Sequence, residues 1–300
     1  MRNRLTLAAR SFAAVATTAL VLSACGSGDT EVSAGSAEDP IVVGVVGAGD
    51  PYWQTFTDLA EAEGIHVELR NFSDYQLPNQ GLSDGELDLN QFQHLQFLAG
   101  YNVNTGSDLT PIGATAVYPL GLYSTKHDSV EAIPDGGEIA IPNDDTNQAR
   151  ALLVLQEAGL LTLRDGGNSF STPADIVAEE SRVTVTPVDA GQTAIALQDV
   201  DASIINNDYV GQANLTAEDA IYSDDPNASA AEPYINVWVS RAEDKDNETF
   251  KKLVEIYHSP EVTEGVLEAS GGTGVIKDND PADLERILAE IEENLQDQQG

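Results

Sequence analysis

The feature that most constrains the fold of this chain is a strand–helix–strand succession near its start. Residues 41–47 (IVVGVVG) form an apolar, β-branched run that ends at a glycine, which is typical of a buried strand. Asp50 and Pro51 are typical of a helix start, and Gly64 is typical of a helix end. Residues 65–69 (IHVEL) follow as a second strand. Such a βαβ unit places two strands in parallel, so the sequence predicts an α/β fold.

The rest of the chain continues this alternation. Further strands are expected at residues 139–142, 183–188, 202–205, 234–239 and 274–276. Helices are expected at residues 95–101, after the capping run 143–147, from the Thr-Pro-Ala-Asp start at 172–175, at 192–197, 250–257 and 262–267, and after Asp280. The apolar segment 112–124 reads as extended, and Pro119 limits it to a sheet edge or to a crossing between two units.

Polar residues gather where the predicted strands end, at residues 72–75, 143–150 and 206–207. Ligands of open α/β sheets bind at the carboxyl ends of strands, so this placement favours a binding site. The stretch 71–96 (NFSDYQLPNQGLSDGELDLNQFQHLQ) adds aromatic groups that arrive from two strand ends. They could wall a pocket for a small, partly apolar ligand, or they could be ordinary core residues.

Arg150 is the sharpest candidate for a ligand contact. It follows a run of helix-capping residues, and a guanidinium close to helix N-terminal amides suits a carboxylate. A salt bridge with one of the 50 acidic residues is the other interpretation. Asn206 and Asn236 can exchange hydrogen bonds with a ligand without adding charge. Turn formation is the alternative role, more so for Asn206 than for Asn236, which is expected inside an apolar strand and needs a partner there.

Composition excludes several classes of protein. The chain has 14 Lys and Arg against 50 Asp and Glu, a formal net charge of -36, so phosphate backbones and anionic membrane faces would repel it. We therefore expect no binding to nucleic acid. Cys25 is the one cysteine, which rules out an internal disulfide and a cysteine-based zinc site.

No catalytic or metal-binding pattern is present. The sequence has no Gly-x-Ser-x-Gly elbow, glycine-rich phosphate loop or His-Glu-x-x-His, and its histidines, at 66, 94, 127 and 258, are scattered. The acidic pairs at 144–145 and 224–225 could touch calcium, but neither matches an EF-hand, and solvated loops explain them better. We expect no enzymatic activity, no cofactor and no metal.

The first residues have the form of a secretory leader. Arginines lie at positions 2, 4 and 10, before an apolar run at 12–22 that is short for a membrane span. The run ends in Leu-Ser-Ala-Cys, which resembles a bacterial lipobox. We predict a lipoprotein signal peptide at residues 1–24, lipidation of Cys25, and a flexible tether at 25–40. Removing the leader takes away three of the 14 basic residues and no acidic residue.

Several segments together resemble the MetQ/NlpA family of methionine-binding lipoproteins, which serve ABC importers. They are FSDYQLPNQGLSDGELDLNQFQH, VYPLGLYS, AIPNDDTNQARALLVLQEAGLL, TPADIV, IINNDY and YINVWV, and the similarity spans residues 41 to about 276. The resemblance implies a two-lobed periplasmic-binding-protein-like fold, with a ligand cleft between lobes that two crossing strands join. We expect lobe 1 to comprise residues 41–123 and 234–300, and lobe 2 to comprise residues 124–233.

The resemblance also implies roles for single residues. Arg150 would pair with the carboxylate of the ligand, and Asn206 and Asn236 would hold its α-amino and carboxylate ends. Four residues would enclose the side chain: Tyr75, Phe92, His94 and Tyr118. The sequence departs from the family at Asn207-Asp208, where relatives often have Gly-Asn, and the loop at 214–232 is long.

The implied function is an amino-acid transport protein that binds methionine, L- and also D-, or a close analogue. The implied partners are an ABC permease in the membrane and the membrane itself, through a lipid such as palmitate on Cys25. We expect a monomer located outside the cytoplasm, on the cell membrane. Another amino acid, a short peptide or a metal ion remains the alternative ligand. A hydrolase would need a nucleophile and a base, and neither can be located.

Overall fold

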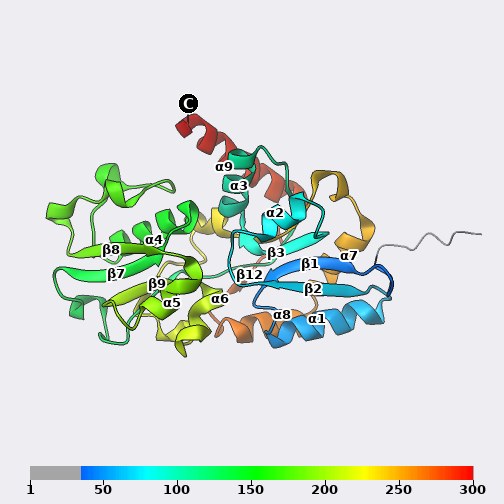
Figure 1. The fold of residues 1–300 in the computed structure, drawn as a ribbon, viewed down its shortest axis with the longest axis horizontal. Helices are drawn as coiled ribbons and strands as arrows, with labels where there is room; N and C mark the ends of the chain where they lie inside the picture. Colours follow the sequence, from blue (N-terminus) through cyan, green and yellow to red (C-terminus); the bar gives the residue numbers. More distant parts are fainter. Residues whose placement is uncertain (1–34, 300) are drawn as a thin grey trace, which may run out of the picture. The chain divides into compact units, whose positions relative to one another are not determined.

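The structure of the chain, a computed structural model, describes residues 35–299. The strands of this part form two five-stranded sheets, with strand orders β2-β1-β3-β11-β4 and β10-β6-β9-β7-β8, and a two-stranded sheet of β12 and β5. We call the part built on the first sheet lobe 1 and the part built on the second sheet lobe 2. Figure 1 shows lobe 2 in green beside lobe 1 in blue and cyan. The predicted signal peptide, Cys25 and residues 26–34 of the predicted tether lie outside the described residues.

The strands of the first sheet are β1 (Ile41–Val46), β2 (Val67–Phe72), β3 (Leu89–His94), β4 (Thr110–Ala114) and β11 (Asn236–Ser240). Those of the second sheet are β6 (Gly121–Tyr123), β7 (Gly137–Pro142), β8 (Val183–Val188), β9 (Ala202–Ile205) and β10 (Tyr222–Ser223). The small sheet pairs β5 (Ala116–Val117) with β12 (Val275–Ile276).

The α-helices are α1 (Pro51–Ala62), α2 (Pro78–Ser83), α3 (Leu95–Thr105), α4 (Asp145–Glu157), α5 (Thr193–Ala196), α6 (Asn207–Val210), α7 (Glu248–Tyr257), α8 (Pro260–Ala269) and α9 (Pro281–Gln299). Short 3-10 helices include η3 (Pro173–Asp175), η5 (Ala190–Gln192), η6 (Gly211–Ala213) and η8 (Ser229–Tyr234). Among residues 35–299, no helix is both long and apolar enough to cross a membrane.

The predicted βαβ unit opens lobe 1. Strand β1 pairs in parallel with β2, from Ile41 opposite Val67 to Val46 opposite Phe72, and β3 pairs in parallel on its other side. Strand β11 enters from late in the chain and runs antiparallel between β3 and β4. The α/β prediction is therefore confirmed. The carboxyl ends of β2 and β3 lie at one edge of this sheet, because both run parallel to β1.

Helices cover both faces of the first sheet. On one face α1, α7 and α8 enclose an aromatic cluster in which Trp53, Phe56, Trp238 and Tyr257 are almost fully buried. The rings of Trp53 and Trp238 meet edge to face with their centroids 6.1 Å apart. On the other face α2, α3 and α9 pack against the sheet through a second apolar cluster. Burial on both faces explains why β1 and β3 carry almost no exposed residue.

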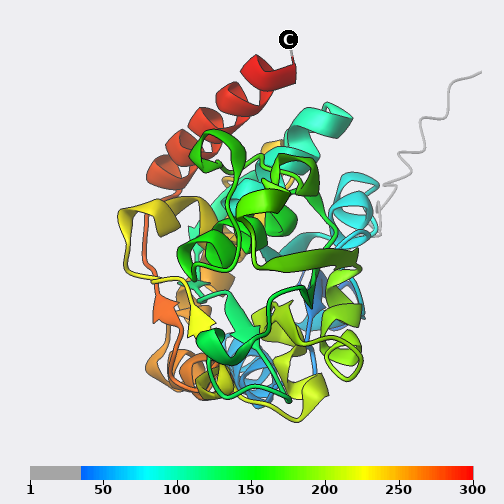
Figure 2. The same ribbon diagram turned by 90° about the vertical axis from the view of Figure 1, so that its left-hand side faces the viewer.

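Lobe 2 is a smaller version of the same layering. Strand β7 lies between β8 and β9, both parallel to it, and β6 and β10 extend the sheet in antiparallel pairing. Helix α4 buries Ala151, Leu152 and Leu155 against one face of the sheet. Helices α5 and α6 cover the opposite face. Figure 2 views the molecule from the side of lobe 2, with the green segments in front and α9 in red at the upper left.

Two segments connect the sheets, residues 115–120 and residues 224–235. The first contains β5 and is extended around Pro119, as expected. The second is not a strand, because it is turn-rich and ends in the 3-10 helix η8. The expected division assigned residues 121–123 to lobe 1, yet β6 pairs with β9 and belongs to the second sheet. The run 112–124 is apolar throughout, so its composition does not mark where the chain changes sheets.

The expected helix at 172–175 is a single 3-10 turn, η3. Its capping box is present, with Thr172 and Asp175 bonded to each other's backbone. The chain turns extended at Ile176 and a helix does not follow. A capping motif fixes only the first turn, since propagation needs an apolar face that packs.

Candidate functional site

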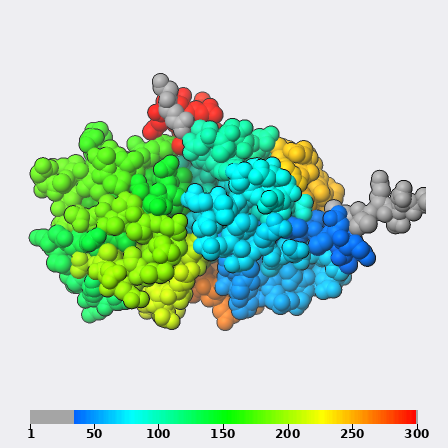
Figure 3. Space-filling view, in the orientation of Figure 1, coloured from blue at the N-terminus to red at the C-terminus, as the bar shows by residue number. Residues whose placement is uncertain are grey.

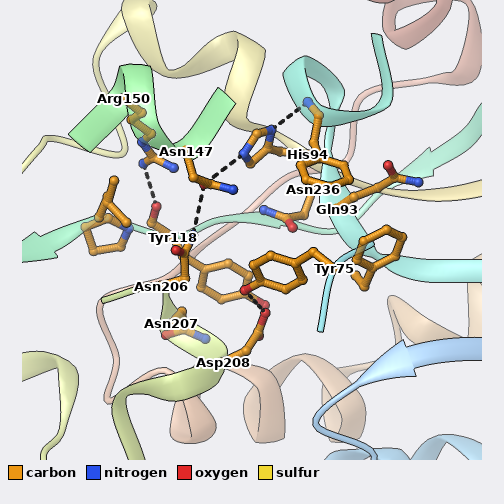
Figure 4. A pocket seen from close by; sticks show the side chains of 14 residues that line it. Tyr75, Gln93, His94, Tyr118, Asn147, Arg150, Asn206, Asn207, Asp208 and Asn236 are labelled. Carbon is orange, nitrogen blue, oxygen red and sulfur yellow. Dashed lines mark hydrogen bonds between the residues drawn. The ribbon is translucent and has the colours of Figure 1, made fainter. Parts of the chain in front are cut away.

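A pocket lies between the two lobes, and all seven residues named as ligand contacts from the sequence line it (Figure 4). They are Tyr75, Phe92, His94, Tyr118, Arg150, Asn206 and Asn236. The pocket is small, with a cavity volume of about 40 Å³. A small ligand in this pocket would therefore touch protein on most sides.

The two lobes touch each other around the pocket. The hydroxyl of Tyr75 in lobe 1 donates a 2.7 Å hydrogen bond to Oδ2 of Asp208 in lobe 2. Tyr209 donates in turn to the carbonyl of Ser73 at 3.4 Å. On the face shown in Figure 3, the green surface of lobe 2 meets the cyan surface of lobe 1 directly. The structure thus has its lobes closed around the pocket.

Aromatic residues of lobe 1 form one wall of the pocket. Tyr75 follows β2, and Phe92 lies in β3, so both come from strands that end at the same sheet edge. Their ring centroids are 6.0 Å apart, and Phe97 packs on both at 6.1 and 5.8 Å. Tyr75 and Phe92 are each 7% exposed and belong to an apolar cluster that includes Tyr209 of lobe 2. Both interpretations of the stretch 71–96 therefore apply, because Tyr75 and Phe92 belong to the core and also line the pocket.

The hydrogen bonds of His94 fix its tautomer. Its Nδ1 accepts from the backbone N–H of Phe97 at 3.1 Å and caps α3, so the ring proton must be on Nε2. Nε2 lies 3.3 Å from Oδ1 of Asn147 in lobe 2, to which it donates. Burial, and then the charge of Arg150, lower the pKa of His94 to about 3. The imidazole is therefore neutral at physiological pH.

Asn147 orients the amide of Asn206. Its Nδ2 donates to the carboxylate of Asp144 at 2.9 Å, so its Oδ1 faces the pocket side and accepts. Nδ2 of Asn206 donates to that Oδ1 at 2.9 Å. This arrangement leaves Oδ1 of Asn206 buried and without a partner among the described residues. An unpartnered buried acceptor that lines a pocket is suited to a ligand donor such as an ammonium group.

Two of the three guanidinium nitrogens of Arg150 donate hydrogen bonds within the protein. Nε pairs with Oδ2 of Asp224 at 2.8 Å, and Nη2 donates to the carbonyl of Tyr118 at 2.9 Å. The guanidinium also lies over the ring of Tyr234, 4.1 Å from its centroid. Nη1 makes no hydrogen bond with the described residues, although the side chain is only 6% exposed. The salt-bridge interpretation is therefore correct, and a donor nitrogen is still left for a carboxylate.

Tyr118 and Asn236 reach the pocket from the two connections between the lobes. Tyr118 lies in the first connection, and burial raises the pKa of its phenol, so the ring stays neutral. Asn236 opens β11 opposite His94, immediately after the second connection. Its Nδ2 makes only a long bond, 3.4 Å, to the carbonyl of Tyr234. The amide of Asn236 consequently has hydrogen-bonding capacity to spare at the pocket.

Sequence reasoning missed several residues of the site, among them Asn147, Asp208, Asp224 and Tyr234. The helix-capping run around Asn147 was visible, but a capping run does not show which amide faces a pocket. Asp224 was considered only for calcium, whereas it binds Nε of Arg150 and the backbone N–H of Leu120. Within the described residues, no three His, Cys, Asp or Glu side chains are placed to hold a metal ion.

Two sheets joined by two connections, with a polar and aromatic pocket between them, define a two-lobed periplasmic-binding-protein-like fold. The sequence model of the NlpA lipoprotein family matches residues 41–278, and the chain belongs to this family.

Relatives support the assignment to this family. The D-methionine-binding lipoprotein MetQ of Salmonella typhi is 38% identical over 273 residues, which cover 89% of this chain and 97% of that protein. The substrate binding protein of a methionine transporter from Streptococcus pneumoniae matches with a TM-score of 0.74 and 35% identity, over 79% of this chain and 95% of that one. A nutrient binding protein from Burkholderia cenocepacia, solved bound to methionine, matches with a TM-score of 0.73 and 37% identity, over 79% and 99%.

Proposed function

We propose that this chain is the substrate-binding component of an ABC importer and that it binds methionine, L- or D-, or a close analogue. The observation that carries the proposal is the gathering of one arginine, two asparagines and an aromatic wall in a single pocket between closed lobes. The names of the relatives support it, since they are described as binding methionine or as serving a methionine transporter.

The contacts of the ligand follow from the groups that lack partners. Nη1 of Arg150 would hold the carboxylate, and Oδ1 of Asn206 would accept from the α-ammonium group. The amide of Asn236 would bond to the same end of the ligand. The rings of Tyr75, Phe92 and Tyr118 with His94 would enclose the side chain, where a thioether packs well on aromatic carbon.

The mechanism would be ligand-driven closure. The ligand contacts both lobes, so it binds the closed arrangement more tightly than an open one and shifts the population toward closure. The closed form would then dock on a permease in the membrane. Binding and release complete this cycle without any covalent step, and the protein would act as a binding protein and not as an enzyme.

The first residues of the sequence and the family support a location outside the cytoplasm, on the cell membrane. Cys25, after a lipobox-like sequence, would carry the lipid that anchors the chain to the outside of the cell membrane. Residues 25–40 would act as a tether between the lipid and the first strand. The pocket is built from the two lobes of one chain, which supports a monomer.

The test is a calorimetric titration of the purified chain with the twenty common amino acids and with D-methionine. We expect saturable binding of methionine and much weaker binding of the others. The assignment of the ligand would be refuted if neither methionine isomer gave heat of binding while another amino acid or a short methionine-free peptide did. Metal analysis of the same preparation would detect a bound metal ion and so test the remaining alternative.

The variant Arg150→Ala tests the site. It leaves the ligand carboxylate in a desolvated place without its cation, so it should remove most of the affinity for methionine. Arg182→Ala is a suitable control, because Arg182 pairs with Asp135 at the surface of lobe 2, away from the pocket. Unchanged affinity in the Arg150 variant would show that the carboxylate binds elsewhere.

A further inference from the structure

Asp208 places a carboxylate in the pocket. It lies in the first turn of α6, next to Asn206 and Asn207, and all three line the cavity. Oδ2 of Asp208 accepts the 2.7 Å hydrogen bond from the hydroxyl of Tyr75. Asp208 is exposed as a residue and lines the cavity, so a ligand can reach the carboxylate.

This carboxylate has no cation beside it. No Lys, Arg or His of the described residues forms an ion pair with Asp208. Protein atoms packed around the carboxyl group take away part of its water and raise the pKa of Asp208 to about 6; the charge of Asp50 also raises this pKa, while the hydrogen bond from Tyr75 lowers it. Asp50 is the N-cap residue of α1 in lobe 1, so a second acid adds to the negative potential from the other lobe.

Asp208 and Arg150 lie at opposite ends of the pocket, as Figure 4 shows. The charge of Arg150 lowers the pKa of His94 and of Tyr234, but it does not shift the pKa of Asp208. The ammonium group and the carboxylate group of an amino acid are both attached to its Cα. A backbone held at Arg150 therefore keeps its ammonium group at the Arg150 end, and the side chain points toward Asp208.

Aromatic rings occupy the space between the two ends. Tyr75 and Tyr118 both line the pocket near Asp208, and Tyr75 packs on Phe92 and on Tyr209, at 6.0 and 5.2 Å between centroids. Burial raises the pKa of the phenols of Tyr75 and Tyr118, so both rings are neutral. Neutral aromatic faces attract methylated cations, and a carboxylate beside them balances the charge.

We propose that the pocket also takes α-amino acids whose side chain ends in a methylated cation, such as a sulfonium, with Asp208 and the tyrosine rings as the site of that cation. The proposal rests on the proposed function, because it needs the amino-acid backbone at Arg150. Methionine brings a neutral methyl thioether to the same place and leaves the carboxylate uncompensated. A sulfonium of nearly the same shape supplies the missing positive charge.

The experiment compares L-methionine with S-methyl-L-methionine by calorimetry at pH 7.5. In the wild-type chain we expect S-methyl-L-methionine to bind at least as tightly as methionine. In Asp208→Asn, which keeps the shape and an acceptor for Tyr75, the ratio of the two affinities should fall by about 10- to 100-fold against the sulfonium. Asp208→Glu, which keeps the carboxylate, should recover part of the preference.

The control is Asp128→Asn, which makes the same change in net charge at an exposed position of lobe 2 outside the pocket. It should leave the ratio unchanged. Thermal unfolding of each variant confirms that it is folded.

Three results would overturn the proposal. Binding of methionine without binding of S-methyl-L-methionine would show that the pocket rejects the cation, while leaving the proposed function intact. An equal loss of affinity for both ligands in Asp208→Asn would show that Asp208 binds the α-ammonium group that both ligands share. Binding of neither ligand by the wild-type chain would refute the proposed function and the inference with it.

Discussion

Replacement of Arg150 by lysine tests whether the geometry of the guanidinium matters beyond its charge. In the structure, its nitrogens are divided between Asp224, the carbonyl of Tyr118 and the open pocket, at 2.8 and 2.9 Å for the first two. The planar group also stacks over the ring of Tyr234. A lysine ammonium is a compact charge that cannot reach all of these places at once.

The expected magnitude follows from the contact that is lost. If the ammonium stays with Asp224 and Tyr118, the ligand carboxylate loses one charge-assisted hydrogen bond, worth about 1.5–3 kcal/mol. That corresponds to roughly a 10- to 150-fold weaker affinity. Alanine also removes the charge and leaves two carboxylates unpaired, for a loss of about 3–5 kcal/mol. The affinities for methionine should therefore fall in the order arginine, lysine, alanine.

Calorimetric titration with L-methionine measures the three affinities, and thermal unfolding checks that each variant is folded. If the lysine variant binds within about threefold of the wild type, the guanidinium fork does not hold the carboxylate. If lysine and alanine lose the same amount, the charge at this position plays no part. Either result would refute the reasoning for the Arg150 end of the pocket.

Two further predictions concern stability. In Gly113→Ala the new Cβ would overlap Cγ1 of Val254 on α7, so we expect a loss of about 1–3 kcal/mol and a fall in Tm by thermal unfolding. Gly211→Ala, which meets no neighbouring atom, should show no such fall, and equal Tm values for the two variants would contradict the packing argument. For Asp208, the raised pKa of about 6 means that the folded state binds a proton more tightly than the unfolded chain, so its stability falls as pH rises through about 4 to 6. The Tm of wild type relative to Asp208→Asn should therefore drop between pH 4 and pH 7, and a constant difference would show that Asp208 is not desolvated.

Much of the fold could be predicted from the sequence because local patterns and tertiary packing agree. The apolar run of β1 and the proline start of α1 predict the first βαβ unit, which the structure contains. The prediction of a helix at 172–175 was wrong because local pattern and packing disagree there: the cap is present, but no apolar face follows it. The boundary between the lobes at residues 121–123 depended on pairing with β9, a strand about 80 positions later in the chain.

The candidate site could also be predicted only in part from the sequence. Residue chemistry alone makes Arg150, Asn206 and Asn236 candidates and leaves Arg150 open between a ligand and a salt bridge, while the family resemblance implies the roles of all seven residues. The structure shows that Arg150 forms the salt bridge and still has a free donor nitrogen, so the two interpretations do not exclude each other. The pairing with Asp224 joins residues 74 positions apart, so no local signal could reveal it.

By itself, the sequence determined the class of fold, the leader-like start, the strong negative charge and the residue types available for binding. These depend on composition and on periodicities that extend over a few turns or strands. The tertiary structure alone decided which groups are left without partners, Nη1 of Arg150 and Oδ1 of Asn206, and that the carboxylate of Asp208 has Tyr75 but no cation beside it. Whether a polar atom is satisfied depends on neighbours that folding brings from distant parts of the chain, and those unsatisfied atoms define the ligand.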